Sequence, residues 1–180
     1  SDSDLKQLNF PQTISDSSIK GIILVEICDK VVCDALSQFN LPIVSVDMPN
    51  VPFEELNGID VVTMESKKNL KKIINQLIEK GAESFGFVGD LYSPNVSRGF
   101  QERYNALSEC LAEHQLPLNQ KNCLLHQTPE DFRNFQTTVN NLQAMISLPD
   151  VFICGNDWTA IQLIYALQFL DRKSTRLNSS

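Results

Sequence analysis

The stretch VVTMESKKNLKKIINQLIEKGAESFGFVGD, residues 61–90, decides the fold. It begins with one short apolar run, VVTM, and ends with another, FGFVG. Gly81 stands where a glycine commonly ends a helix. The apolar residues between the two runs recur with the spacing of an amphipathic helix: Leu70, Ile73, Ile74, Leu77 and Ile78. A strand, a crossover helix and a second strand together indicate a parallel sheet.

The same alternation runs through the rest of the chain. The spacing predicts strands at 22–25, 42–47, 61–64, 84–89, 123–126 and 151–155. It predicts helices at 29–39, 66–80, 97–114, 128–146 and 157–170. We therefore expect an α/β fold with parallel sheets covered by helices. Ligands in such folds bind beyond the carboxyl ends of the strands, so the first candidates are the residues there: Glu26, Asp47, Glu65, Asp90, Asn156 and Asp157.

Composition excludes several classes of protein. Hydrophobic residues make up 42% of the 180 residues, which is enough for a packed core and excludes wholesale disorder. No apolar run approaches the roughly 18–20 residues that span a bilayer, and the amino-terminal residues show no signal-peptide pattern. The net charge of −7 makes the chain itself a poor direct binder of nucleic acid.

Residues that could support catalysis or metal binding are sparse. The five cysteines are scattered without a C-x-x-C, so we interpret them as free thiols in a reducing compartment. His114 and His126 each stand alone and are interpreted as helix-end and strand-end residues without a chemical role. The sequence has no glycine-rich phosphate loop and no nucleophile elbow. We expect no cofactor, no metal and no enzymatic activity.

The last ten residues, DRKSTRLNSS at 171–180, break the pattern. They follow an apolar helix that is predicted to end at Leu170, and they carry no hydrophobic period. The string looks like a translated sequencing-library adapter, and a natural frayed tail is the alternative. In either case we exclude it from the fold prediction.

Three segments resemble the ligand-sensing core of the lactose-repressor/galactose-repressor family of bacterial transcription regulators. They are GAESFGFVGD (81–90), QERYNALSECL (101–111) and LPDVFICGNDWTAIQLIYAL (148–167). The order of upstream strands and helices agrees, so the resemblance covers about residues 19–170. That core is itself similar to periplasmic sugar-binding proteins, whose fold has two lobes.

The resemblance implies that residues 1–81 form part of the first lobe and residues 82–170 part of the second. Both lobes are expected to be incomplete, because family members have further strands on either side. A sugar or sugar phosphate would be clamped between the lobes and would modulate binding to operator DNA. Family members contact that DNA through an amino-terminal helix-turn-helix, which this sequence lacks. The resemblance also implies a cytoplasmic homodimer without membrane contact.

The resemblance points to a set of ligand-binding residues. The family pattern Arg-x-x-Gly-aromatic falls on Arg103, with Ala106 and Leu107 at the other two positions. Arg103 would offer a planar fork of donors to hydroxyls, a carboxylate or a phosphate. The family's strand-end Asn-Asp pair falls on Asn156 and Asp157 without alteration. Asn156 can both donate to and accept from a sugar hydroxyl, whereas Asp157 is expected to cap the following helix.

Three further residues complete the predicted site. Trp158 could pack against the apolar face of a sugar, or be a partly buried aromatic at a helix start. Asp90 is a candidate for the rim of the site, with a solvated loop position as the alternative. Asp47 is a similar candidate whose role is expected to be structural. The family's Asp-Asn of the first lobe is replaced by Glu65-Ser66.

Two other classes of protein stay open. A solute-binding protein for sugar uptake would share the fold, but it would need a secretion signal, and such proteins seldom carry five unpaired cysteines. An enzyme has no motif in its favour.

Overall fold

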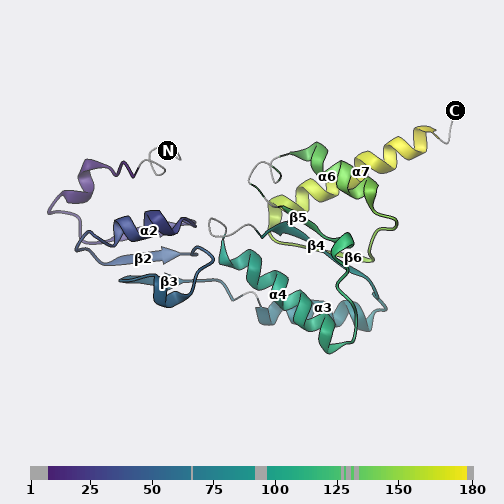
Figure 1. The fold of residues 1–180 in the computed structure, drawn as a ribbon, viewed down its shortest axis with the longest axis horizontal. Helices are drawn as coiled ribbons and strands as arrows, with labels where there is room; N and C mark the ends of the chain where they lie inside the picture. The colour runs from purple at the N-terminus through teal and green to yellow at the C-terminus, as the bar shows by residue number, and fades with distance from the viewer. Residues whose placement is uncertain are drawn as a thin grey trace. The chain divides into compact units, whose positions relative to one another are not determined.

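A computed structural model describes residues 8–65, 67–91, 97–126, 128, 131 and 134–177, with side chains up to Asp171. The chain divides into two compact units, residues 1–64 with 93–99 and residues 65–92 with 100–180. The described strands are β1 (Ile22–Val25), β2 (Ile43–Val46), β3 (Ile59–Val62), β4 (Phe85–Asp90), β5 (Leu124–His126) and β6 (Val151–Cys154). The described α-helices are α2 (Lys30–Leu36), α3 (Lys67–Glu79), α4 (Arg98–Glu113), α6 (Phe135–Ala144) and α7 (Asp157–Leu177) (Figure 1). Short 3₁₀ turns lie at Gln12–Ser15, Phe53–Glu55 and Gln120–Asn122.

The first unit is built on a three-stranded parallel sheet in the order β1-β2-β3. Helix α2 begins where the Asp29 carboxylate accepts a hydrogen bond from the Val31 amide at 2.8 Å, which is an ordinary amino-terminal cap. One face of the sheet packs against α2 and the neighbouring turns. The buried core is made of Leu24, Val32, Cys33, Leu36, Ile43, Met48 and Leu56.

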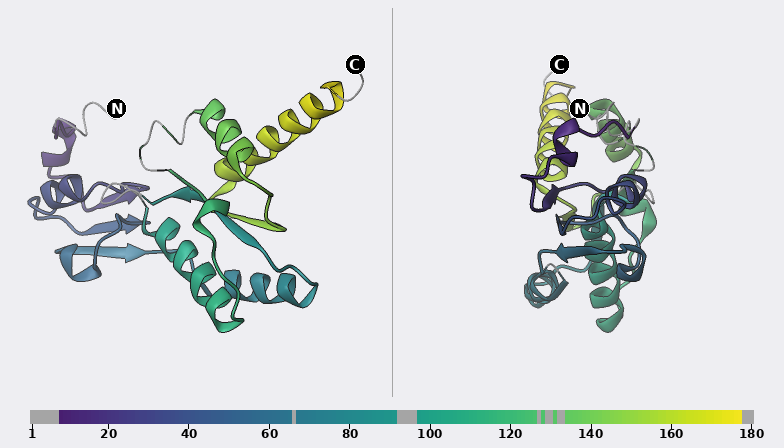
Figure 2. Two further views of the ribbon diagram at one scale, coloured as in Figure 1. Left: turned by 45° about the vertical axis from the view of Figure 1, so that its right-hand side comes forward. Right: turned by 90° about the vertical axis from the view of Figure 1, so that its left-hand side faces the viewer.

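The second unit is built on a three-stranded parallel sheet in the order β5-β4-β6. All six residues of the central strand β4 are buried, because helices lie on both faces. Figures 1 and 2 show α3 and α4 on one side of this sheet and α6 and α7 on the other. The first side holds the cluster of Ile74, Phe85, Phe87, Leu107, Cys110, Leu111 and Ile153. The second holds Val88, Leu124, Val139, Leu142, Leu163 and Ala166.

The predicted α/β class with parallel sheets is confirmed, and the predicted strands agree with the structure to within two residues. The boundary between units differs from the predicted one at Gly81. Helix α3 belongs to the second unit, because Ile74 is fully buried among Phe85 and Phe87. The sequence predicted that helices cover both faces of each sheet, and this is confirmed for the second unit only. In the described part of the first unit, β1 leaves Ile23 and Val25 exposed.

Three helices differ from their predicted bounds by more than one residue. Helix α2 ends at Leu36, three residues before the predicted end at Phe39. The Thr128 hydroxyl accepts from the Asp131 amide at 3.3 Å, as the predicted cap requires. Helix α6 itself begins later, at Phe135, where Asn134 accepts from the Thr137 amide at 3.3 Å. Residues 129, 130, 132 and 133 of that predicted helix lie outside the described residues. Helix α7 continues past Leu170 to Leu177, since no glycine or proline interrupts it there. None of the described helices combines the length and apolar composition that crossing a bilayer requires.

Candidate functional site

The carboxyl edge of the second sheet brings several polar groups together. Strands β5, β4 and β6 run parallel, so they all end at the same edge. Asp90 ends β4, His126 ends β5, and Gly155 follows β6 and donates its amide to the Val88 carbonyl at 2.7 Å. This edge is where an α/β sheet binds ligands. The predicted residues Asp90, Arg103 and Asn156 all lie in this unit, together with Asp157 and Trp158.

Asp90 and His126 form a buried polar pair. They are direct partners in the β4–β5 register, and the His126 Nδ1 lies 2.6 Å from the Asp90 Oδ1. Only 4% of Asp90 and 7% of His126 is exposed, so neither side chain is a solvated loop residue. The interpretation of His126 as a residue standing alone was therefore wrong. Residues that are far apart in sequence become neighbours because two parallel strands end side by side.

Helix α4 holds the end of β6 through two side chains. The Arg103 Nη1 donates to the Gly155 carbonyl at 2.7 Å, which places the guanidinium beside the Gly155–Asn156 turn. A β-carbon at position 155 would lie 2.2 Å from the buried ring of Phe100, so only glycine fits there. Arg103 has five donors, and this bond uses one of them.

Asn156, and not Asp157, caps helix α7. The Asn156 Oδ1 accepts from the Thr159 amide at 2.9 Å, while the Asn156 amide donates to the Thr159 Oγ1 at 3.1 Å. The predicted cap at Asp157 was wrong, because Asp157 is already the first helical residue. The cap fixes the orientation of the Asn156 side chain, which is exposed at the start of α7. Trp158 is 52% exposed at the start of the same helix.

Asp47 lies in the other unit and holds its own loop together. The Asp47 Oδ2 accepts from the Ser97 hydroxyl at 2.5 Å, and its Oδ1 accepts from the Met48 amide at 2.8 Å. The Ser45 hydroxyl donates to the Asp47 carbonyl at 2.6 Å. Asp47 also has a φ of 69°, a left-handed conformation that this network stabilises. These bonds support the structural role expected for it. Ser66, of the Glu65-Ser66 pair, lies outside the described residues.

The cysteines are neutral and unpaired. All five are free thiols, as predicted. Burial raises the pKa of the Cys28 thiol to about 12, and the nearby carboxylates of Asp47 and Glu26 act in the same direction. Burial likewise raises the pKa of Cys154 to about 11. These thiols are poor nucleophiles near neutral pH, because the thiolate is the reactive form. Among the described residues, no group of three His, Cys, Asp or Glu could hold a metal ion.

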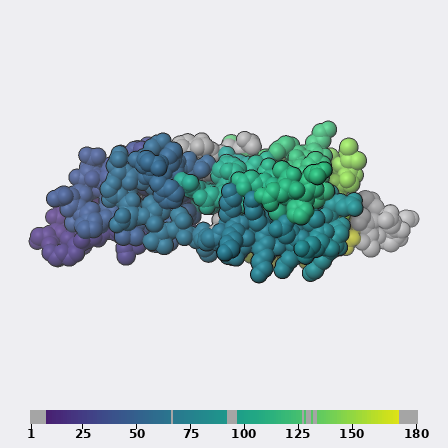
Figure 3. Space-filling model, turned by 90° about the horizontal axis from the view of Figure 1, so that it is seen from below, coloured from purple at the N-terminus to yellow at the C-terminus, as the bar shows by residue number. Residues whose placement is uncertain are grey.

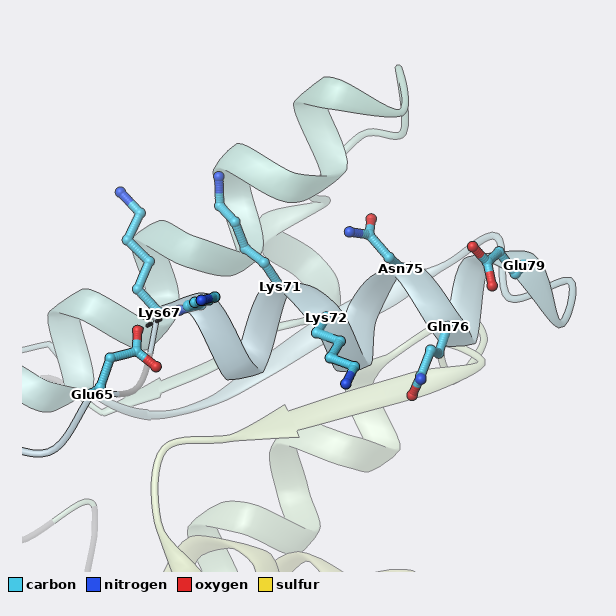
Figure 4. Close-up of a pocket in the computed structure, with 8 residues that line it drawn as sticks. Glu65, Lys67, Lys71, Lys72, Asn75, Gln76 and Glu79 are labelled. Carbon is cyan, nitrogen blue, oxygen red and sulfur yellow. Dashed lines mark hydrogen bonds between the residues drawn. The ribbon is translucent and has the colours of Figure 1, made fainter.

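A wide groove of about 720 Å³ lies elsewhere, along helix α3. Figure 3 shows this side of the second unit, and Figure 4 shows the side chains along the helix. Lys71 lies 3.1 Å from Glu109 and 2.8 Å from Glu113 of α4, and Lys67 lies 2.9 Å from Glu109. These ion pairs offset the charge of Lys67 and Lys71, two of the lysines that line the groove. All eight residues that line the groove are charged or amide residues of the one segment 65–79, so we interpret it as a solvated helix face.

Sequence reasoning missed three residues at the carboxyl edge: His126, Phe100 and Thr159. Only His126 carried a signal in the sequence, since it ends a predicted strand. The contacts of Phe100 and Thr159 depend on the three-dimensional packing of α4 and α7 against the sheet.

Comparison with known proteins gives consistent results. A family model described as a periplasmic binding protein-like domain matches residues 74–173. The chain is 33% identical over 115 residues to catabolite control protein A of Staphylococcus xylosus, and 32% identical over 108 residues to that of Staphylococcus epidermidis. These matches cover 62% and 59% of this chain but 32% and 30% of the relatives. The chain thus spans about a third of the length of the curated relatives it matches.

Solved structures of regulators share the fold. The transcription regulator CcpA of Lactococcus lactis aligns with a TM-score of 0.70 at 14% identity, over 94% of this chain and 58% of that one. A LacI-family regulator from Lactobacillus casei with bound glucose aligns with a TM-score of 0.64 at 19% identity, over 94% of this chain and 59% of that one. At such low identity these likenesses show the fold alone.

Proposed function

Because the chain belongs to the periplasmic binding protein-like domain family, we propose that it is the effector-binding domain of a bacterial transcription regulator. The observation that carries the proposal is the 33% identity over 115 residues to catabolite control protein A. The domain would sense a small molecule and pass the signal to operator DNA. The DNA would be contacted through a separate helix-turn-helix head, since an acidic chain with a net charge of −7 is a poor DNA binder.

The proposed effector is a sugar or a sugar phosphate. The carboxyl edge of the second sheet supports this class, because Arg103 and Asn156 supply donors suited to hydroxyls or a phosphate. Asp157 and Trp158 lie beside them at the start of α7. The ligand would stabilise one state of the regulator over another by its difference in affinity for the two states. The glucose bound to the Lactobacillus casei regulator makes glucose a sensible first probe.

We further propose a homodimer in the cytoplasm. Helix α7 exposes an apolar stripe whose members are 46–61% exposed: Ile161, Ile164 and Tyr165. A stripe of this kind supports association with another apolar surface. The five free thiols support a reducing compartment. An Ile161→Glu substitution should shift the protein to monomer in sedimentation velocity, whereas an exposed polar control, Gln168→Glu, should not.

The alternative from the transport class is a sugar-binding protein of an uptake system. It shares the fold, but the curated relatives named above are regulators, which favours sensing over transport. The same relatives favour binding over catalysis. The gene region discriminates the two: a helix-turn-helix encoded upstream supports a regulator, and a secretion signal there supports transport.

A thermal-shift panel tests the effector proposal. The purified protein is melted with D-glucose, D-ribose, D-glucose 6-phosphate and adenine, each at a series of concentrations. We expect at least one sugar or sugar phosphate to raise the Tm, and Arg103→Ala to abolish that rise. Gln101→Ala, on an exposed turn of the same helix, is the matched control and should keep it. A rise that survives in Arg103→Ala removes Arg103 from the site, and no rise with any of the sugars contradicts the effector class.

A further inference from the structure

The turn that leads into β3 holds an asparagine followed by a glycine, Asn57-Gly58, and both residues are exposed. The Ile59 amide donates to the Leu56 carbonyl at 3.3 Å, which closes a four-residue turn around the pair. Gly58 has a φ of 71°, as the third residue of a type II turn requires. We propose that Asn57 is a site of spontaneous covalent modification, at which the side-chain amide is lost to give aspartate and isoaspartate.

The reaction needs a backbone nucleophile beside the Asn57 side chain, and Gly58 supplies it. The Gly58 nitrogen gives its proton to hydroxide and attacks the Asn57 Cγ, which closes a five-membered succinimide ring. The bond from Cγ to the side-chain nitrogen breaks, and that nitrogen takes a proton from water and leaves as ammonia. Water then opens the ring: cleavage between the Gly58 nitrogen and Cγ gives aspartate, and cleavage at the main-chain carbonyl gives isoaspartate. Overall one water is consumed and one ammonia is released, so no other reactant is needed.

The fold leaves both reacting groups available. Within the part of the chain that the structure describes, neither the Asn57 side chain nor the Gly58 amide makes a hydrogen bond. A β-carbon at position 58 would meet nothing within 4 Å, so the backbone there is open to solvent. Attack from Gly58 is also unhindered, because glycine has no side chain to shield its nitrogen. The turn therefore keeps the reactivity that the Asn-Gly pair has in a free chain.

Asn105 is a matched asparagine that the fold protects. It is exposed and followed by another small residue, Ala106, but both lie inside helix α4. The Asn105 side chain accepts from the Gln101 amide group at 2.8 Å. The Ala106 nitrogen is held in the helical hydrogen-bond ladder and cannot turn towards the Asn105 carbonyl carbon. Exposure alone is therefore not enough, and Asn105 serves as an internal control.

Isoaspartate should disturb the first unit more than aspartate does. It routes the backbone through the former side chain, which adds one carbon to the chain between Leu56 and Ile59. Leu56 is 5% exposed in the core of the first unit, and Ile59 packs against the same core and is the register partner of Ile43. Because both ends of the turn are anchored, the extra carbon must strain the turn or shift the strand. Aspartate keeps the backbone and adds only a charge at an exposed position.

Peptide mapping by mass spectrometry tests the site. The purified 180-residue chain is aged at physiological temperature, and electron-transfer fragmentation distinguishes isoaspartate from aspartate. Asn57 should lose its amide at least about tenfold faster than Asn105, because only Asn57 can align with the next nitrogen. Asn57→Gln should stay intact, since its longer side chain would have to close a six-membered ring. A chain kept unfolded in guanidinium chloride gives the rate set by sequence alone, and the folded rate should lie within about tenfold of it. A folded Asn57 that stays intact while the unfolded chain reacts overturns the proposal.

Melting temperatures of the same samples test the structural consequence. The Tm of the aged protein should fall, and that of aged Asn57→Gln should not. Freshly purified Asn57→Asp carries the charge without the extra backbone carbon, so it should melt close to the unaltered protein. An unchanged Tm in the modified protein overturns the predicted destabilisation. An equally large fall in fresh Asn57→Asp overturns its assignment to isoaspartate. Neither result depends on which effector the protein binds.

Discussion

The two units build the same kind of sheet but cover it differently. In the second unit β4 is buried over its whole length between two layers of helices. In the first unit the described helix α2 covers one face, and the other carries exposed apolar residues: Ile23, Val25, Val46 and Val62. Both strands β1 and β4 are apolar in sequence. An apolar strand therefore predicts that both faces of its sheet are buried. Whether they are buried depends on which helices pack against the sheet.

Matched truncations on the two sheets should show the largest difference. Phe87→Ala removes a fully buried ring between β4 and α4, and it should cost about 3–5 kcal/mol of the free energy of unfolding. Ile23→Ala, at a position 73% exposed on β1, should change it by less than about 0.5 kcal/mol. Urea denaturation followed by hydrogen exchange, which resolves the two units, measures both changes.

A large cost at Ile23 would break the comparison, because it would mean that this face of β1 is covered in solution. An Ile23→Thr variant adds a second readout. If the face is open, the more polar side chain should lower self-association of the protein in light scattering without loss of stability.

Glycine-to-alanine substitutions should also destabilise the second unit more than the first, because the backbone packs more closely there. A β-carbon at Gly155 would lie 2.2 Å from the buried Phe100 ring, so Gly155→Ala should cost about 1–3 kcal/mol. A β-carbon at Gly21 of the first unit would lie 3.0 Å from the Pro42 carbonyl, which needs only a small shift. Alanine also lowers the conformational entropy of the unfolded chain, which stabilises the folded state by about 0.4–1 kcal/mol. This gain should offset the cost of the shift, so Gly21→Ala should be nearly neutral. Differential scanning calorimetry of both variants tests this order.

Sequence reasoning reached the elements because they depend on local patterns. The spacing of Leu70, Ile74 and Ile78 predicts α3 to within a residue at each end. That spacing does not predict the unit to which α3 belongs. It shows that α3 has an apolar face, but not which of the two sheets this face packs against. The structure assigns it to the second unit through the contact of Ile74 with the Phe85 cluster.

The candidate site was reached in part for the same reason. Asp90 and Asn156 follow strands, so their place at the edge could be predicted. The partner of Asp90 could not, because strand order decides which strand end lies beside it, and the order β5-β4-β6 brings His126 there. The shift of the cap from Asp157 to Asn156 depends on the residue at which the first helical turn starts.

Removing a helix cap should cost each unit a similar and smaller amount of stability, because both caps make the same kind of bond. Asp29→Ala removes the bond to the Val31 amide in the first unit, and Asn156→Ala removes the bond to the Thr159 amide in the second. Each should cost about 1 kcal/mol. Ser replacements at both positions should recover most of the loss in urea denaturation. A cap in one unit that costs several times more than the other would show that the units differ in more than sheet cover.

Two exposed carboxylates give the smallest expected effect and a pH test of the same comparison. Hydrogen bonds from the Ser84 hydroxyl, and from the Glu83 and Ser84 amides, lower the pKa of Asp150 below its ordinary 3.8. In the first unit, bonds from Ser18 lower the pKa of Asp16. A carboxyl whose pKa is lowered on folding stabilises the folded state at pH values above its ordinary pKa. This contribution is lost as the pH falls through 3.8 to the folded pKa.

Asp150 joins the starts of β4 and β6, whereas Asp16 closes a local turn. Asp150→Asn should therefore reduce the fall of the melting temperature between about pH 5 and pH 2. This reduction should be larger than the one that Asp16→Asn causes. An equal reduction by both would mean that the local turn matters to its unit as much as the strand-to-strand contact matters to the other.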